Sequence, residues 1–134
     1  MTERKNINRG FKQLHVWQDA VDLYVLACKH LMNAPWELRK TFANCIDASH
    51  SIGRNIAEGY CRRGLKEYLN FCNIALASSG EFHSCLVSFL KAGQISESTF
   101  EEMDLLHYKT ENELIQLIKS LQIKLKEKDW NTEF

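Results

Sequence analysis

Residues 51–59 of the chain read Ser-Ile-Gly-Arg-Asn-Ile-Ala-Glu-Gly. Asn55 and Glu58 are three residues apart, so they share one face of a helix. Ile52 and Ile56 are four residues apart and define an apolar stripe beside that face. A polar pair next to a packed apolar stripe is not needed for bulk stability, so this stretch predicts a specific contact between two helices.

Apolar residues outside this stretch also recur at spacings of three and four, which predicts helices along most of the chain. We expect four helices, at about residues 14–31, 36–56, 65–92 and 98–124. Gly59 and Gly93 are residue types that favour a helix end. Ser98 and Glu101 match a capping box at the start of the fourth helix.

The connections between the expected helices are short, and short connections favour antiparallel neighbours. The sequence therefore predicts an all-α fold, an antiparallel up-down-up-down four-helix bundle that forms a single domain at residues 11–128. Residues 1–10 are a polar N-terminal segment open to disorder, and residues 129–134 are a C-terminal tail.

The composition limits the classes of function. The chain has 134 residues, of which 45% are hydrophobic, and its 17 basic and 17 acidic residues cancel. A neutral chain is not drawn as a whole toward phosphates, so nucleic-acid binding would need a local patch or an oligomer that repeats one. No apolar run approaches the ~20 residues of a membrane span, and we expect a cytoplasmic protein without a membrane partner.

The five cysteines are an odd number and form no Cys-x-x-Cys pair. We expect small buried side chains in a reducing compartment. A zinc site or a disulfide framework is the alternative.

A longer pattern includes the opening stretch. Its residues are Leu14, Val16, Trp17, Gln18, Ala20, Pro35, Glu37, Ser51, Ile52, Asn55, Ile56, Ala57, Glu58, Gly59, Arg62 or Arg63, Lys66, Glu67, Tyr68, Phe71, Ile74, Ala75, Ser78 and Glu81. In this pattern the chain resembles the four-helix-bundle family of proteins encoded in intervening sequences of bacterial 23S rRNA genes. The accessory proteins of diversity-generating retroelements are similar to that family.

The resemblance implies a bundle that assembles into a ring, typically a homopentamer, and it implies no established catalytic activity. The retroelement relatives bind nucleic acid and a reverse transcriptase. Mid-helix, where the family often has Gln and a basic pair, this chain reads Asn-Cys-Ile-Asp at residues 44–47. The lost positive charge weakens the expectation of a nucleic-acid surface. The joint also departs from the family pattern, because it often reads Gly-Arg-Arg-Ser in the family and reads Cys-Arg-Arg-Gly at residues 61–64 here. Gly64 is a weaker helix cap than serine, but an acceptable one.

The polar residues of the pattern are candidates for a structural network. We expect hydrogen bonds between the second and third helices that fix their register, because buried polar networks specify packing. Acid–base catalysis by the two carboxylates is the alternative, but no nucleophile or metal ligand stands at a clear spacing. The candidate network residues are Asn55, Glu58, Ser78 and Glu81.

Cations and aromatic residues cluster at the joint between the second and third helices. Together they could hold phosphate and stack a base, and a ring would repeat the patch and raise its avidity. An ordinary solvated turn is the alternative. The candidate nucleic-acid-binding residues are Arg54, Tyr60, Arg62, Arg63 and Lys66.

The third helix has two apolar stripes. One of them can be buried within the bundle, and the other needs a further partner. We therefore expect subunit contacts from its aromatic residues. The candidate interface residues are Tyr68, Phe71, Phe82 and Phe89.

Two Asp-x-x-His pairs, Asp47 with His50 and Asp104 with His107, have a spacing used by di-iron bundles, and Glu81 could supply a further ligand. The match is incomplete because Asp replaces Glu in both pairs and no inward acid is evident on the first helix. We therefore expect no metal and no cofactor.

These patterns predict a protein that is not an enzyme but an oligomeric scaffold or adaptor that contacts RNA or DNA through a repeated basic patch. One alternative is a purely structural oligomer that binds another protein and no nucleic acid. A di-metal carboxylate enzyme is the weakest alternative. The expected partners are copies of the chain, in a pentamer as the resemblance implies. RNA or DNA and a reverse transcriptase or another protein are further candidates, and no membrane is expected.

Overall fold

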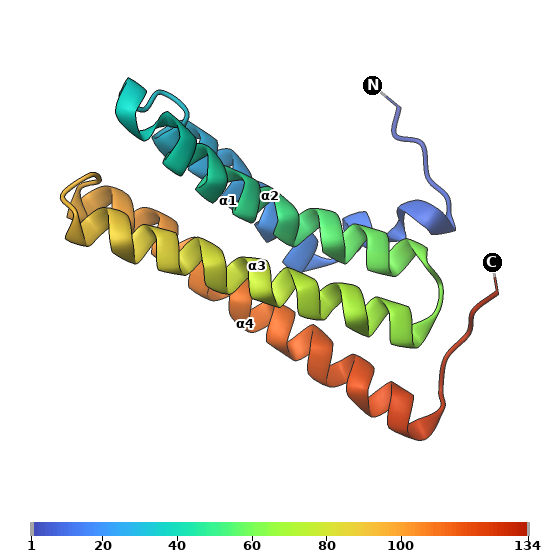
Figure 1. The fold of residues 1–134 in the computed structure, drawn as a ribbon. Helices are drawn as coiled ribbons and strands as arrows, with labels where there is room; N and C mark the ends of the chain where they lie inside the picture. The colour runs from blue at the N-terminus through green and yellow to red at the C-terminus, as the bar shows by residue number, and fades with distance from the viewer. Residues whose placement is uncertain (1, 134) are drawn as a thin grey trace.

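The computed structural model describes residues 2–133, and in this range the chain is all helical with no β-strand (Figure 1). Four α-helices are joined by short segments, and two 3-10 helices precede α1 and α2. The elements are η1 (Ile7–Gln13), α1 (His15–Leu31), η2 (Trp36–Leu38), α2 (Arg39–Cys61), α3 (Leu65–Lys91) and α4 (Glu97–Glu127). η1 begins inside the N-terminal segment that the sequence left open to disorder.

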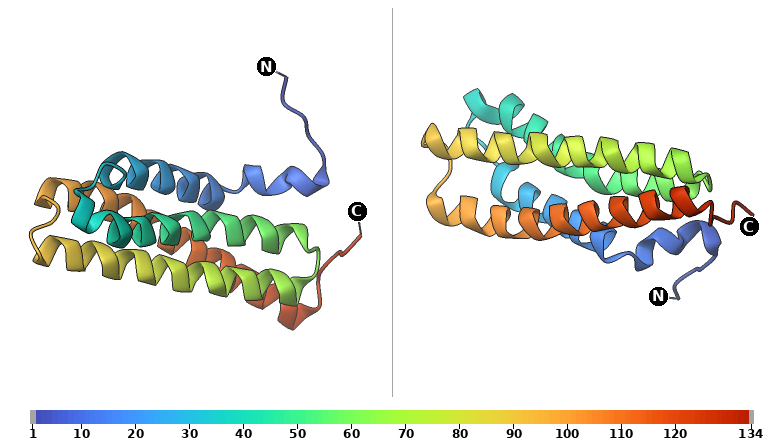
Figure 2. Two further views of the ribbon diagram at one scale, coloured as in Figure 1. Left: turned by 45° about the horizontal axis from the view of Figure 1, so that its top comes forward. Right: turned by 90° about the horizontal axis from the view of Figure 1, so that it is seen from below.

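Each α-helix packs against two others. α2 contacts α1 and α3, and α4 contacts α3 and α1. Figures 1 and 2 show the long helices side by side, with both ends of the chain at the end of the molecule where α2 turns into α3. None of the helices among residues 2–133 combines the length and the apolar character of a membrane span.

The core lies between the four helices and confirms the apolar spacing seen in the sequence. Ile52 and Ile56 of the opening stretch are fully buried, as are Leu23, Phe82 and Met103. Burying a side chain of this size contributes about 1.5–3 kcal/mol, so the amphipathic stripes account for why these segments are helices at all.

The prediction that Gly59 favours the end of α2 is wrong, because α2 continues to Cys61. Gly59 is buried inside the helix, and a Cβ atom there would lie 2.8 Å from Cβ of Phe71 on α3. Its lack of a side chain thus allows a close approach of two helices. The chain leaves the helix at Arg63, whose φ of 65° is left-handed.

Two other helix ends test the sequence signals. The third helix ends as predicted, since Gly93 has φ 71° and the N–H of Gln94 donates to the Phe89 carbonyl oxygen at 2.8 Å. The start of α4 differs from the prediction. Ser96, not Ser98, is the N-cap, and its Oγ accepts a hydrogen bond from the N–H of Thr99 at 3.0 Å.

Candidate functional site

A polar junction joins α2 to α3. The Ser51 and Ser78 hydroxyls lie 2.8 Å apart across the two helices. Asn55 Nδ2 donates to the Ser51 carbonyl oxygen at 2.8 Å and to Ser51 Oγ at 2.9 Å. The structure therefore connects Asn55 with Ser78, as the sequence predicts, through a serine that the prediction did not include.

The two carboxylates predicted for this network lie elsewhere. Glu58 accepts a hydrogen bond from Arg62 Nη2 at 2.9 Å along the same helix. Glu81 is exposed on α3. The predicted four-residue network is thus corrected to three residues, Ser51, Asn55 and Ser78, because the carboxylates at these helical positions face solvent.

The basic residues at the α2–α3 turn are partly neutralised. Arg62 pairs with Glu58 and, at 3.5 Å, with Glu67. The hydrogen bond to Glu58 raises the pKa of the Arg62 guanidinium. The same guanidinium lies 5.1 Å from the ring centroid of Phe71. These contacts fix Arg62 within the chain and leave less of its charge for phosphate.

Arg63 is held by the C-terminal tail. Its carbonyl oxygen accepts a hydrogen bond from Trp130 Nε1 at 3.0 Å, and its Nη2 donates to the Glu133 carbonyl oxygen at 3.1 Å. Its guanidinium lies 5.9 Å from the ring centroid of Tyr60. Lys66 is exposed on the first turn of α3. The turn therefore combines a cation, an aromatic ring and a docked tail.

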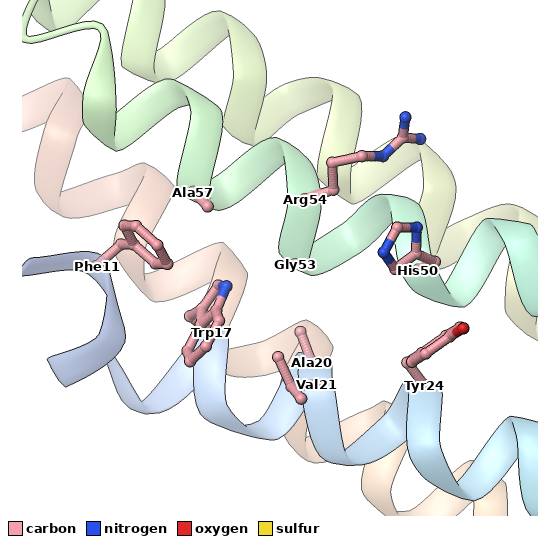
Figure 3. A pocket seen from close by; sticks show the side chains of 9 residues that line it. All are labelled: Phe11, Trp17, Ala20, Val21, Tyr24, His50, Gly53, Arg54 and Ala57. Carbon is pink, nitrogen blue, oxygen red and sulfur yellow. The ribbon is translucent and has the colours of Figure 1, made fainter. Parts of the chain in front are cut away.

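Arg54 stands apart from the turn, eight positions before Arg62 on α2, which is about 12 Å along a helix. It is exposed at the edge of an apolar groove between α1 and α2, with a volume of about 440 Å³ (Figure 3). The five candidate nucleic-acid residues therefore occupy two places. The groove is lined by Phe11, Trp17, Ala20, Val21, Tyr24, His50, Gly53, Arg54 and Ala57.

Aromatic contacts shape this α1–α2 groove. Phe11, from η1, meets Trp17 edge to face at a centroid distance of 5.1 Å, and Tyr24 lies 4.9 Å from the His50 ring. Figure 3 shows Trp17 and Tyr24 on α1 opposite Gly53 and His50 on α2. Gly53 has no side chain to fill the space, so the wall of the groove is recessed there.

Three of the four aromatic residues predicted at a subunit interface belong to the core of the single chain. Tyr68, Phe82 and Phe89 are 3%, 0% and 3% exposed. Because α3 contacts both α2 and α4, its two apolar stripes are both covered within one chain. Phe71 is the half-buried member, and it lies beneath Arg62.

A histidine cluster lies between α3 and α4. His83 Nδ1 is 2.9 Å from Asp104 Oδ1, and the His83 and His107 rings stack at a centroid distance of 5.3 Å. His107 Nε2 lies 2.9 Å from both the carbonyl oxygen and Oγ of Ser79. Among residues 2–133, the side chains of metal-binding type that lie close enough together to share an ion are His83, Asp104 and His107. This group contains Asp104 and His107, which are one of the two predicted pairs. Its third member is His83, whereas the sequence suggested Glu81 as the further ligand.

An acidic pair lies between α1 and α4. Burial, a hydrogen bond to Asp19 and the charge of Asp19 raise the pKa of Glu113 to about 7. Burial opposes ionisation of Asp19, but hydrogen bonds from Glu113 and from Lys109 lower its pKa overall. Lys109 Nζ lies 3.1 Å from Asp19 Oδ2. The arrangement is a pair of carboxyl groups next to one cation at the contact between α1 and α4, and Glu113 also lines an open hollow of about 390 Å³.

All five cysteines are free within residues 2–133. Cys45 and Cys72 are fully buried, as expected for small apolar side chains, and burial raises the pKa of Cys72 to about 12. Thiols held in the neutral form are poor nucleophiles and poor metal ligands.

The fold and its polar contacts define a class of small, single-domain, all-helical proteins. The chain belongs to the 23S rRNA-intervening sequence protein family, whose sequence profile matches residues 12–121. No curated protein matches it. It is similar in fold to a crystal structure from Bacteroides thetaiotaomicron VPI-5482, a protein of unknown function from the S23 ribosomal protein family. The TM-score is 0.69 at 20% identity, over 78% of this chain and 95% of that one.

Proposed function

We propose that the chain is a non-enzymatic scaffold that assembles head to tail with copies of itself, the α1–α2 groove of one copy receiving apolar side chains of the next. In this proposal α1 to α4 form an antiparallel up-down-up-down four-helix bundle. The short turns and the packing of each helix against two others support that arrangement.

The observation that supports the proposal is the presence of two different apolar surfaces on one chain. The groove is lined mainly by apolar side chains. On α4, Leu105 and Tyr108 are 67% and 63% exposed and lie one turn apart. A contact between two unlike surfaces generates a ring when its rotation closes. Zero net charge removes the repulsion that would keep copies apart.

The family resemblance gives the ring an expected size of five. Light scattering and sedimentation velocity on the purified chain should then give a particle five times the 15.6 kDa of one chain. A particle of one chain mass at micromolar concentration would exclude the proposal.

Matched variants locate the contact. Val21→Asp places a charge in the groove, whereas Val25→Asp, one turn along α1, alters a side chain that is 58% exposed outside it. On α4, Leu105→Asp is matched by Ile123→Asp, since Ile123 is 57% exposed. We expect Val21→Asp and Leu105→Asp to dissociate the assembly and the two controls to preserve it. Circular dichroism distinguishes dissociation from unfolding.

RNA or DNA binding is a second candidate function, favoured by exposed cations at Arg54 and Lys66 that an assembly would repeat. The ion pairs of Arg62 reduce the charge of the patch. A gel-shift titration across salt tests it, because phosphate binding weakens steeply as salt rises. If the protein binds no RNA or DNA at low salt, the remaining candidate is a structural oligomer that binds another protein. A reverse transcriptase as partner, and the link to retroelement accessory proteins, stay predictions.

A further inference from the structure

The histidine cluster between α3 and α4 has the chemistry of a metal site. One ligand atom from each of His83, Asp104 and His107 lies within 4.8 Å of the other two. Imidazole nitrogen and carboxylate oxygen are ligands that zinc and related divalent ions prefer. We infer that these three side chains bind a divalent transition-metal ion of the Zn²⁺ class and thereby link α3 to α4.

The contact between His83 and Asp104 resembles that of two ligands sharing one ion. His83 Nδ1 is 2.9 Å from Asp104 Oδ1, yet this nitrogen is shielded from solvent and makes no hydrogen bond with any described residue. Two ligands of a tetrahedral zinc ion, each ~2.0 Å from the metal, lie about 3.3 Å apart. An ion between the two side chains would satisfy the nitrogen, which otherwise remains without a hydrogen bond in a buried position.

His107 is prepared as a ligand by its contact with Ser79. A carbonyl oxygen only accepts hydrogen bonds, so the 2.9 Å contact with the Ser79 carbonyl places the proton on His107 Nε2. The lone pair of the neutral ring is then on Nδ1. Metal-binding histidines commonly donate their other N–H to a carbonyl or carboxylate, which fixes the tautomer and the ring orientation. Ser79 Oγ extends this support by donating to Glu111 at 3.3 Å.

The site is accessible and can adjust. The side chains of His83 and Asp104 are 45% and 29% exposed, whereas that of His107 is 3% exposed. An ion can therefore enter from the His83 side, and water can complete its coordination. A separation of up to 4.8 Å must close by as much as ~1.5 Å to reach the ~3.3 Å between two ligands of tetrahedral zinc. The half-exposed His83 side chain can rotate, so the distances that involve it can shorten.

The second Asp-x-x-His pair provides a matched control within the chain. Asp47 and His50 have the same spacing on α2, and both are exposed. Within the described part of the chain, neither belongs to a cluster of three side chains that could share a metal ion. A single pair of this kind binds divalent ions weakly, so a change at its exposed Asp47 measures the contribution of an ordinary surface pair.

Isothermal titration of tag-free, chelator-treated full-length protein with ZnCl₂ tests the inference, with Co²⁺ absorption spectra as a second measurement of the ligand set. We expect one Zn²⁺ per chain. His83→Gln and Asp104→Asn should each lower Zn²⁺ affinity by at least tenfold, since even outer-shell changes cost about 10–100-fold. Asp47→Asn, the matched change at an exposed carboxylate outside the groove, should change it by less than about twofold, within the range of an uninvolved surface residue.

Several results would overturn the inference. These are the absence of Zn²⁺ binding by the folded protein, an equal loss of affinity in Asp47→Asn and Asp104→Asn, or a Co²⁺ spectrum unchanged by His83→Gln. Both altered ligands are at least partly exposed, so their variants should fold, and circular dichroism checks this. The test is independent of the proposed self-association, because all three ligands belong to one chain and none of them lines the α1–α2 groove.

Discussion

The backbone at Gly59 approaches the side chain of Phe71 so closely that a Cβ atom at position 59 would lie 2.8 Å from Phe71 Cβ. Tyr68 Cδ1 would be 3.1 Å from the same atom. Real Cβ atoms do not come this close to their neighbours, so any side chain at position 59 would push α2 and α3 apart. The spacing of these two helices therefore depends on one glycine.

Replacing this glycine tests that dependence. Gly59→Ala should destabilise the protein by about 1–3 kcal/mol, the usual cost of overpacking a core, measured by urea denaturation. Gly80→Ala is the matched control, because Gly80 is also in a helix but has no atom within 4 Å of the added Cβ. The control should gain roughly 0.5–1 kcal/mol from helix propensity. Equal effects of the two variants would contradict the close-packing role.

The serine contact between α2 and α3 should show energetic coupling. Ser51→Ala and Ser78→Ala each remove one partner of the 2.8 Å contact and leave the other polar group partly buried. Each should cost about 1 kcal/mol, and the double variant should cost less than the sum by about 0.5–1.5 kcal/mol. A double-mutant cycle in thermal denaturation measures this. Strict additivity would mean that the two hydroxyls do not interact.

The pair of Glu113 and Asp19 predicts a pH dependence of stability. The folded state raises the pKa of Glu113 from 4.5 to about 7, so it holds this proton to higher pH than the unfolded chain does. The resulting stability is fully present below 4.5 and is lost as the pH rises through about 7.

Glu113→Gln removes the ionisation and keeps a donor for Asp19. Above pH 7 the variant should be more stable than the wild type by on the order of 1 kcal/mol, a value already reduced for solvent screening. The difference should shrink as the pH falls toward the ordinary pKa of 4.5. Unfolding curves across this range measure it, with the exposed Glu101→Gln as control. Parallel pH profiles of Glu113→Gln and wild type would refute the raised pKa of Glu113.

The cysteines should differ in their reaction with a thiol reagent. Cys45 and Cys72 are 0% exposed, and burial raises the pKa of both thiols. We expect neither to react in the native protein at mildly alkaline pH and both to react in denaturant. Cys28, which is only partly buried, should react faster than these two. Mass spectrometry of the labelled peptides identifies the sites, and rapid native labelling of Cys72 would contradict the core described above.

Much of the fold follows from local patterns in the sequence. The spacing of Ile52 and Ile56 predicts a buried stripe, and Gly93 predicts the end of α3, because both depend on residues close together in the chain. The start of α4 was misplaced by two residues because Ser96 and Ser98 are both acceptable caps, and only the observed hydrogen bond to Thr99 distinguishes them.

Contacts between helices were harder to predict. The two stripes of α3 indicated a need for partners, but the sequence did not show that α2 and α4 supply both, which makes Phe82 and Phe89 core residues. The same reason explains why His83 was not grouped with Asp104 and His107. Position 83 meets position 104 only through the packing of α3 on α4, and no spacing within one helix encodes that distance.

The indole N–H of Trp130 donates a hydrogen bond to the Arg63 carbonyl oxygen, so the fluorescence of Trp130 can report the position of the C-terminal tail. The other two of the three tryptophans stand elsewhere, Trp17 in the wall of the groove and Trp36 on the surface. With both changed to phenylalanine, the remaining emission reports whether the last segment is seated on the turn between α2 and α3. Fluorescence can then follow tail release separately from global unfolding.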